Sequence, residues 1–599
     1  MDQNQLYNLY YSSAERNRGL FFKEKKSLTL ISVLRLAVFF AGIFVTVFAF
    51  SFGTLAGIIA AALSISAFLF LIYLFVIHSE RKAFYENLMQ ISEKEMRALK
   101  GNFTGFSPGD KWVDTCHNYS HDIDLFGDHS LFQFIDRTVT GNGREKLACW
   151  LFDTFSLSDK INIRQEAIAE LSEKFEWRQE FLARAKGKSL ENEDIQQLID
   201  WLSDNSDSGM SAILKVFLWT GPCLAIISLI LLVSGLLPYP VFTSIFLINL
   251  MIILGRFKST GEIHNQVSRR HLFLSSLISL LVAFKDEPFK SALLSEIKKE
   301  IATEDVSAVI SLKKLSRIIR SFDSRLNMIV GFLLNGLLLW DLHCIRSLEK
   351  WKEESKTELP EWLEKIGEVD ALISLANFAF NNPDYCYPLV STDESVFSAK
   401  NLAHPLLDRD KRVANDFIIS ERGKVILITG ANMSGKSTFL RTVAVNLILA
   451  MAGAPVCAEK MKFIPLKLFT SMRTTDSLSH NESYFYAELK RLKVLKTNLE
   501  LGEPVFFILD EILKGTNSVD KSIGSKKFTA KIIELGGTGM IATHDTSLCE
   551  LEESFPDKVI NKCFELEIDG ENISFDYKLI DGVTRKMNAA LLMKQMGIA

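Results

Sequence analysis

The chain has 599 residues, of which 48% are hydrophobic and 23% are charged, so it is long enough for several domains with ordinary cores. A net charge of −4 excludes a protein that is basic overall, and any surface for nucleic acid must therefore be local. The eight cysteines include no C-x-x-C pair and no metal-like cluster. This indicates reduced, packed thiols in a cytosolic setting.

Two nearly uncharged runs near the N-terminus, residues 36–50 and 55–77, are joined by a short turn and flanked by basic residues. The second run is long enough to cross a hydrocarbon core of about 30 Å, and the first is long enough if Arg35 extends its charge to the interface. We expect a transmembrane hairpin with both ends in the cytosol. A cleaved signal peptide is disfavoured, because the first run starts late and lacks a small-residue cleavage pattern. A buried soluble hairpin is the alternative.

A second pair of apolar runs, residues 216–237 and 241–255, surrounds a Pro-Tyr-Pro turn and predicts a second hairpin. Residues 326–340 form a further apolar run, but this run is short, contains two asparagines and ends at Asp341. A fifth crossing would also place the C-terminal part of the chain on the opposite side of the membrane from the N-terminal segment. We therefore expect a buried helix at 326–340 and about four transmembrane helices in the cytoplasmic membrane.

The remaining sequence up to about Pro388 has helical spacing of its apolar residues, and short strands alternate with helices from there to the end. We expect a multidomain protein with α-helical membrane hairpins, an all-α region and a C-terminal α/β domain. The predicted boundaries are a cytosolic lead segment at 1–27, hairpin 1 at 28–78, a helix and linker at 79–109, a helical region in two parts at 110–212 and 257–387, hairpin 2 at 213–256 between them, and the α/β domain at 388–599.

A glycine-rich loop follows the apolar strand at 425–428. Residues 430–437 fit the pattern G-x-x-x-x-G-K-[ST] between a strand and a helix, which is the context of a P-loop. The backbone N–H groups of such a loop and the positive helix N-terminus bind phosphate. We expect Lys436 to contact the β- and γ-phosphates of ATP and Ser437 to hold Mg²⁺; a chance glycine turn is the alternative. The predicted nucleotide-binding residues are Gly430, Asn432, Met433, Ser434, Gly435, Lys436, Ser437 and Thr438.

Two acidic residues end the apolar strand at 505–512. Downstream of a P-loop, Asp510 fits a Mg²⁺ ligand and Glu511 fits the general base that polarises the attacking water. Solvated turn residues are the alternative. After a further apolar strand at 539–542, His544 is placed to contact the γ-phosphate as a sensor, although an isolated histidine is more often an ordinary surface residue.

Together these motifs resemble the MutS-type mismatch-repair ATPases, which are relatives of the ABC ATPases. The loop TGANMSGKST resembles that family's TG-P-N-M-x-GKST with Ala431 in place of proline, DEILKGTNSVD resembles DE-I-x-x-GT-S-x-x-D, and ATHD matches A-T-H. Residues 476–488 resemble the family's signature stretch, with Asn481 in place of glycine and Tyr484 in place of threonine. Ser483, Phe485 and Glu488 match it.

The resemblance extends beyond these motifs. Residues 122–151 and 371–388 resemble the start and the end of the MutS core domain, and residues 404–405 and 415–416 resemble the lead-in to the ATPase. Residues 575–598 resemble the closing helical segment that packs on a partner subunit. The resemblance therefore implies MutS core and lever helices for the all-α region and an ABC-like P-loop NTPase for the C-terminal domain.

The resemblance also implies a composite site in a homodimer, in which Ser483 of one subunit completes the phosphate site of the other. ATP binding then closes the interface between the ATPase domains and hydrolysis releases it. The implied cofactors are ATP and Mg²⁺. The expected catalytic residues are Lys436, Ser483, Glu511 and His544, and the expected Mg²⁺ ligands are Ser437 and Asp510.

Two departures from the family pattern leave the function open. The mismatch-sensing domain has no counterpart before Asp110, and hairpin 2 falls where the lever helices and DNA clamp are expected. One hypothesis is a membrane-anchored ATPase with ATP-dependent binding of double-stranded or branched DNA. The other is an ATP-driven conformational motor that acts on membrane helices or on a protein partner. Four spans and Asn481 disfavour a third reading, an ABC-type transporter. The basic residues available for phosphates, which equally suit a solvated helix face, are Arg269, Arg270, Lys298, Lys299, Lys313, Lys314, Arg317 and Arg320.

Overall fold

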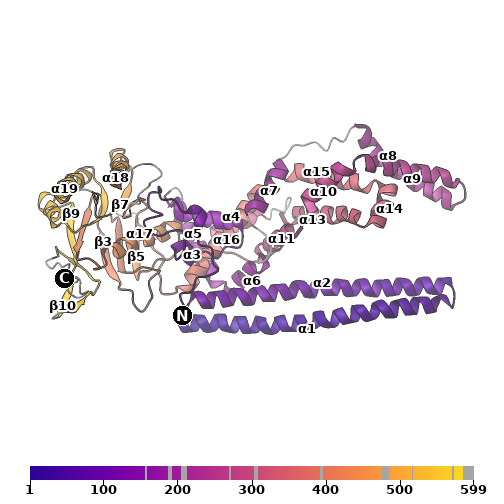
Figure 1. Cartoon of the computed structure of the whole chain (residues 1–599), viewed down its shortest axis with the longest axis horizontal. Helices are drawn as coiled ribbons and strands as arrows, with labels where there is room; N and C mark the ends of the chain where they lie inside the picture. Colours follow the sequence, from indigo (N-terminus) through magenta and orange to yellow (C-terminus); the bar gives the residue numbers. More distant parts are fainter. Residues whose placement is uncertain are drawn as a thin grey trace.

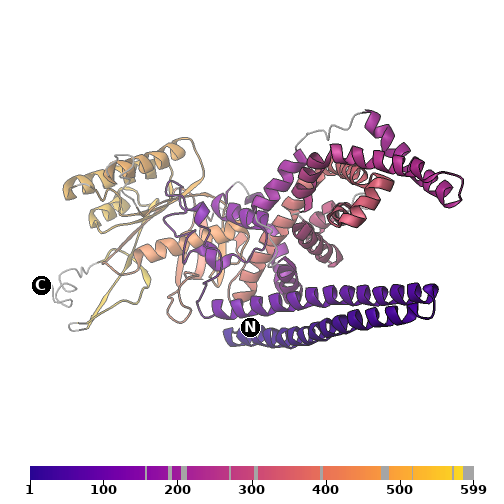
Figure 2. The ribbon, with the colours of Figure 1, turned by 45° about the vertical axis from the view of Figure 1, so that its right-hand side comes forward.

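The computed structural model describes residues 1–155, 158–185, 192–203, 212–268, 271–301, 308–391, 395–473, 484–515, 517–569 and 572–584. The molecule is elongated. The β-sheets lie at one end, a helical body lies in the middle, and two helical hairpins extend toward the other end (Figures 1 and 2). Both views show the tips of the two hairpins pointing away from the sheets. Arg269, Arg270 and Ser483 lie outside the described residues.

The first hairpin consists of α1 (Gln3–Phe50) and α2 (Thr54–Ala98), which lie side by side along their whole length (Figure 1). Asp2 caps α1 with a capping box, and the turn at 51–53 leads into α2. The predicted lead helix and the charged stretch at 79–100 are thus continuous with the apolar runs. Each helix contains an apolar 18-residue window with at most two charged residues, and almost none of that window is buried.

The second hairpin consists of α8 (Ala212–Val233) and α9 (Tyr239–Gly255). By length and composition, α8 is a third candidate span from Ile213 to Val233, and α9 forms a bent pair with α10 (Phe257–Ser268) at 64°. A further bent pair, at 80°, consists of α14 (Met328–Leu338) and α15 (Trp340–Ser355).

The prediction of a buried helix at 326–340 is wrong. Met328 is 86% exposed and Ile329 is 72% exposed. In α14 only Gly331, Asn335 and Gly336 are buried, because α8 and α9 cover one side of the helix. The short length, the two asparagines and the even number of crossings argue against a full span, but none of them says whether protein or lipid covers the apolar residues.

The helical body is built around α16 (Glu358–Asn381), which is buried along most of its length and packs against α4 (Gly141–Phe152) and α5 (Ile161–Glu173). Large buried side chains such as Trp150 and Phe181 fill the space between these helices. The other helices of the body are α3 (Leu131–Ile135), α6 (Phe175–Ala185), α7 (Asn192–Ser203), α11 (His271–Asp286), α12 (Ala292–Ile301) and α13 (Ala308–Asp323).

The C-terminal region contains a six-stranded sheet in the order β12-β9-β4-β8-β7-β6, parallel except for β12. A second sheet, in the order β1-β5-β2-β3, lies beside it, and β10 and β11 form a small hairpin. The strands are β1 (Leu389–Val390), β2 (Phe397–Leu402), β3 (Asn415–Ile419), β4 (Val425–Gly430), β5 (Lys460–Phe463), β6 (Lys467–Ser471), β7 (Val505–Asp510), β8 (Thr538–Ala542), β9 (Val559–Phe564), β10 (Glu567–Asp569), β11 (Asn572–Ser574) and β12 (Leu579–Asp581).

Helices cover both faces of the six-stranded sheet, which explains why β4 is buried at every position. Because successive side chains of a strand point to opposite faces, Ile426 and Ile428 join the core that contains α17 (Lys436–Ala452). Val425 and Leu427 face α18 (Tyr484–Glu500) and α19 (Ser518–Glu534). Short helical turns at Thr546–Glu550 and Leu551–Ser554 follow β8. The carboxyl ends of β4, β7 and β8 consequently meet at one edge of the sheet.

Candidate nucleotide-binding site

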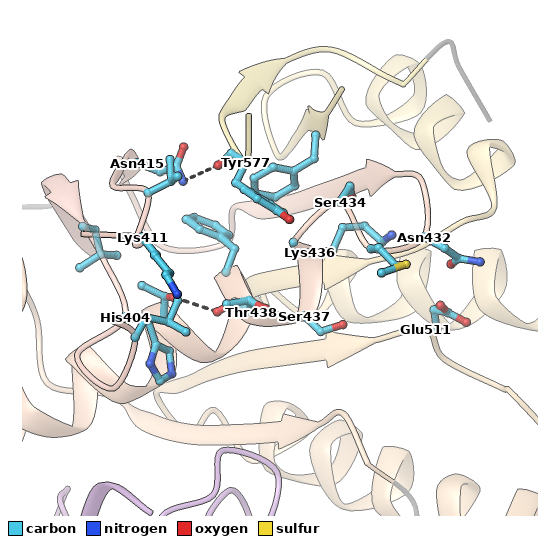
Figure 3. A pocket seen from close by; sticks show the side chains of 18 of the residues that line it. His404, Lys411, Asn415, Asn432, Ser434, Lys436, Ser437, Thr438, Glu511 and Tyr577 are labelled. Carbon is cyan, nitrogen blue, oxygen red and sulfur yellow. Dashed lines mark hydrogen bonds between the residues drawn. The ribbon is translucent and has the colours of Figure 1, made fainter. Parts of the chain in front are cut away.

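A cavity of about 500 Å³ opens where β4 ends and α17 begins (Figure 3). The glycine-rich loop between these two elements lines one side of the cavity with residues 432–435. Glu511, which follows β7, and His544, which follows β8, line it as well. In an open parallel sheet, ligands bind at such an edge, beyond the carboxyl ends of the strands.

The backbone of the loop wraps tightly around its own lysine. The Lys436 Nζ atom donates hydrogen bonds to the carbonyl oxygens of Gly430 and Ala431, each at 2.9 Å. Burial lowers the pKa of the Lys436 ammonium, and the carboxylates of Asp510 and Glu511 oppose this shift. Gly435 has φ 99°, and a Cβ atom there would lie 3.0 Å from the Tyr577 ring. A side chain at position 435 would therefore meet both backbone strain and a close contact.

Two oxygen ligands suited to Mg²⁺ meet at the start of α17. The Ser437 hydroxyl donates to the Asp510 carboxylate, with 2.6 Å between Oγ and Oδ2. Hard oxygen donors, few in number, are what Mg²⁺ uses when phosphate oxygens and waters complete its octahedron. The Ser434 Oγ atom is buried in the same loop without a hydrogen-bond partner among the described residues. These groups fit a magnesium nucleotide.

Glu511 is held as a carboxylate at the mouth of the cavity. Its Oε1 atom lies 3.0 Å from His544 Nε2, and its Oε2 atom lies 3.6 Å from Lys521 Nζ. The hydrogen bond from His544 is the main reason that the pKa of Glu511 falls to about 2. Glu511 also has φ 52°, which is uncommon for a residue other than glycine and indicates that its surroundings fix the backbone. A carboxylate so oriented can accept a proton from a water molecule in the cavity.

A buried carboxylate supports this loop from behind. Glu488 of α18 is 3% exposed and accepts hydrogen bonds from the N–H groups of Leu513 at 2.5 Å and Lys514 at 3.0 Å. Burial raises the pKa of Glu488. The last residue of the signature stretch, Glu488, thus positions the chain just after Asp510 and Glu511.

The structure brings most of the predicted site residues together. Asn432, Met433, Ser434, Gly435, Lys436, Ser437, Thr438, Glu511 and His544 line the cavity. Gly430 and Asp510 lie just behind this lining and contact it through Lys436 and Ser437. Ser483 falls outside the described residues, so its predicted role in a partner's site stays a prediction.

Sequence reasoning missed the opposite wall of the cavity. His404, Leu407, Lys411 and Val413 line it from the segment between β2 and β3, and Tyr577 lines it from the segment before β12 (Figure 3). The Asn415 side chain donates to the Tyr577 carbonyl oxygen at 3.0 Å and so joins these two segments. The only signal in the sequence was the resemblance at 404–405 and 415–416, which assigned no role to the side chains.

Comparison with known proteins places this site in a family. Residues 426–596 match the family model of MutS domain V. Over 250 residues the chain is 32% identical to "DNA mismatch repair protein MutS" of Thermotoga maritima, and the aligned region covers 41% of the chain and 31% of that protein. Over 336 residues it is 26% identical to human "MutS protein homolog 4", which covers 54% of the chain and 33% of that protein.

The chain spans about a third of the length of these curated relatives. The match to MutS domain V begins in β4 and includes the glycine-rich loop, Asp510, Glu511 and His544. This match and the similarity to the MutS proteins support membership of the chain in the MutS family.

Proposed function

We propose that this protein is a membrane-anchored, Mg²⁺-dependent ATPase of the MutS family and that ATP controls its binding of DNA. The observation that carries the proposal is the convergence of Lys436, the Ser437–Asp510 pair and the Glu511–His544 pair on one cavity in a MutS domain V.

The chemistry follows from these side chains. Lys436 neutralises charge on the β- and γ-phosphates, and Ser437 and Asp510 hold Mg²⁺ directly or through water. Bound Mg²⁺ neutralises charge on the phosphate oxygens. Glu511 orients the attacking water and accepts its proton, while His544 holds the Glu511 carboxylate and faces the terminal phosphate.

The test of the ATPase is the turnover of the purified full chain and of Lys436→Ala. Loss of a positive group at the phosphates should lower kcat on the order of 100-fold. Lys526→Ala is the matched control, because Lys526 pairs with Glu550 on the surface away from the cavity and should leave turnover unchanged. Wild-type turnover by Lys436→Ala would refute the assignment of the site.

The proposal of membrane anchoring is supported by the two hairpins. Their helices present apolar residues to the outside along a length that suits a bilayer, and both tips point away from the α/β end of the molecule (Figure 1). With both hairpins inserted in the cytoplasmic membrane, all cytosolic segments, including the cavity, lie on one side of it.

The proposal of DNA binding is supported by the relatives, two of which are named for mismatch repair or as MutS homologues. Its test uses detergent-solubilised Glu511→Gln, which should bind ATP without hydrolysing it, with matched, mismatched and branched duplexes across a salt series. Tight binding that weakens steeply with salt supports a DNA clamp. Glu511→Gln combined with Lys436→Ala is the control, because it should not hold ATP. Absence of binding with ATP would leave the second candidate below.

One observation favours the second candidate, an ATP-driven motor that acts on membrane helices. Asn381, near the end of α16, donates to Glu95 of α2 at 3.0 Å and accepts from the Tyr10 hydroxyl of α1 at 2.8 Å. Arg409 donates to the Asn381 carbonyl oxygen at 3.1 Å, and its loop also carries Leu407 and Lys411, which line the cavity. Hydrogen bonds thus connect the first hairpin to the loop that lines one wall of the cavity.

This second candidate is tested by the lipid dependence of ATP hydrolysis. If the connection transmits movement, insertion of the protein into vesicles should change its turnover, and Asn381→Leu should remove that change without abolishing basal hydrolysis. Glu93→Gln is the control, because Glu93 lies on α2 but pairs with Arg18 at the surface. Turnover that is equal in detergent and in vesicles would count against the motor.

We also propose that the working unit is a homodimer formed through the ATPase domains. The Lys521 Nζ atom of α19 lies 3.6 Å from Glu511 Oε2, so the start of this helix is near the cavity. Exposed apolar side chains occur on both: Met433, which lines the cavity, is 74% exposed, and Val519 and Ile523 of α19 are 65% and 52% exposed. Apolar residues so exposed beside a polar site suit a surface that a second subunit covers when ATP is bound.

A further inference from the structure

The helix α14 has its two flanks tied together by a buried ion pair. Arg325 lies just before the helix and Asp341 just after it, and the Arg325 Nε and Asp341 Oδ2 atoms are 3.5 Å apart. Their side chains are 9% and 2% exposed. A helix that crossed a bilayer would separate such flanking residues by about 30 Å. The 11 residues of α14 have a length of about 16 Å. The residues on either side of α14 therefore lie together, so the chain enters and leaves this segment at the same place.

One side of α14 packs deeply against the second hairpin. The Phe332 ring lies 5.2 Å from the ring of Phe246, which is near the middle of α9. Gly336 allows this approach, because a Cβ atom there would lie 2.2 Å from the Phe246 ring. The side chain of Asn249 is fully buried and donates to the Gly336 carbonyl oxygen at 2.8 Å. Contact at the midpoint of α9 places α14 at the level of the predicted membrane span.

The segment satisfies its own backbone polar groups at both ends. Asn327 caps the start of α14 and accepts from the N–H groups of Ile329 and Val330, each at 3.2 Å. At the other end, Leu339 turns the chain with φ 50° and its N–H donates to the Asn335 carbonyl oxygen at 3.1 Å. The Asn335 side chain accepts from the N–H of Asp341 at 2.9 Å. Such internal pairing is a requirement for backbone at membrane depth.

The other side of α14 is open, apolar and uncharged. Met328 and Ile329 are 86% and 72% exposed, and Phe332 and Leu333 are about half exposed. The charges nearest in the chain are outside the helix, at Arg325 and Asp341. This surface continues the apolar surface of α8 and α9, against which α14 packs. A continuous exposed surface without charged residues is better suited to contact with lipid acyl chains than with water.

We propose that α14 is a re-entrant membrane helix, which enters and leaves the bilayer on the cytosolic side and contacts lipid acyl chains with Met328, Ile329, Phe332 and Leu333. This inference rests on the membrane anchoring in the proposed function. It resolves the conflict between an apolar fifth segment and an even number of crossings, because a re-entrant helix leaves the cavity on the same side as the rest of the cytosolic body.

The test measures the surroundings of single cysteines in the full chain reconstituted into phosphatidylcholine vesicles. The exposed Cys116, Cys149 and Cys223 are first replaced by serine. Ile329→Cys reports on α14, Leu63→Cys on the first hairpin, Leu236→Cys on the turn of the second hairpin, and Glu353→Cys on α15. The extent of labelling of each variant by a membrane-impermeant maleimide is measured before and after vesicle lysis. For the spin-labelled form of each variant, the accessibility of the label to oxygen and to a polar nickel chelate is measured.

If α14 is re-entrant, Ile329→Cys should not be labelled by the maleimide from either side of the membrane. Its spin label should be as accessible to oxygen, relative to the nickel chelate, as the label at position 63. Three results would overturn the proposal. Labelling of position 329 equal to that of position 353 would place α14 in water, labelling from the side of position 236 would make α14 a full span, and protection from both oxygen and nickel would mean that protein covers it.

The anchoring itself is read from other positions. If positions 63 and 236 are both labelled from the side of position 353, the membrane anchoring of the proposed function fails, and the re-entrant helix fails with it. Failure at position 329 alone refutes the re-entrant helix and leaves the anchoring intact. Gly336→Leu adds a readout of packing, because its clash with Phe246 should displace α14 and raise labelling at position 329.

Discussion

At the scale of single residues, the cavity is organised by charges that remain fixed at neutral pH. Glu511 is the clearest case, because the hydrogen bond from His544 lowers its pKa to about 2. A general base needs to be ionised to accept a proton, and Glu511 meets this condition well below neutral pH. Its neighbour therefore controls both its orientation and its ionisation.

Removal of His544 should raise the pKa of Glu511 toward its ordinary value of 4.5. In the wild type, Glu511 stays ionised down to pH 5, so its protonation should not lower kcat between pH 8 and pH 5. In His544→Ala, about a quarter of the Glu511 side chains should be protonated at pH 5, so kcat at pH 5 should be about a quarter lower than at pH 7 for this reason. The measurement is the pH profile of kcat, with His544→Asn as the control that retains a donor. Identical profiles for wild type and His544→Ala would contradict this account.

His404 makes the stability of the ATPase domain depend on pH. Burial lowers its pKa from 6.5 to about 4, and its Nδ1 atom accepts a hydrogen bond from the Leu406 N–H at 3.3 Å. Between pH 6.5 and pH 4 the unfolded state therefore binds more protons than the folded state, so stability falls as the pH falls. The loss from this group is at most about 3 kcal/mol. His404→Gln should reduce the difference in unfolding free energy between pH 7 and pH 5, measured by chemical denaturation, and an unchanged difference would contradict this account.

At the scale of elements, the joint between the first hairpin and the helical body depends on a buried ion pair. Glu95 of α2 is 1% exposed, and its Oε1 atom lies 2.5 Å from Arg137 Nε. Asn377 and Asn381 of α16 donate to the same carboxylate. One carboxylate thus connects α2, α16 and the segment between α3 and α4. The hydrogen bonds to the Glu95 carboxylate offset the free energy that its burial costs.

Glu95→Gln should destabilise the protein by about 3 kcal/mol, because it leaves the Arg137 guanidinium buried without its counterion. The measurement is chemical denaturation in detergent. Glu93→Gln is the matched control on the same helix; its partly exposed pair with Arg18 should contribute about 0.5 kcal/mol. Equal stability of the two variants would show that the buried pair does not hold the hairpin to the body.

At the scale of the whole molecule, an elongated chain places the cavity and the apolar hairpins at opposite ends (Figure 2). The helical body between them connects the two ends through α16, which is the last helix before the α/β region. Within the described residues, a change at the cavity can therefore reach the hairpins through the helical body.

Ile523→Glu should prevent ATP-dependent dimerisation, because it places a charge in the apolar surface beside the cavity. The measurement is the mass of the detergent-solubilised Glu511→Gln protein with and without ATP, by sedimentation. Leu501→Glu is the control, since Leu501 is also exposed, at 72%, but lies in the turn between α18 and β7. If Ile523→Glu dimerises with ATP as readily as the control, α19 does not form the interface.

Sequence alone determined the parts of this protein that depend on local pattern. The glycine-rich loop and the residues after β7 and β8 could be predicted as neighbours, because parallel strands bring their carboxyl ends to one edge. The two helical hairpins could be predicted because each pair of long, nearly uncharged runs is joined by a short turn. Only the tertiary structure decided which residues from distant segments complete the cavity, such as His404 and Tyr577, because no local pattern encodes a contact between them. It also decided the position of α14, since apolar composition states that a helix avoids water, while packing against α8 and α9 decides which side of it remains open.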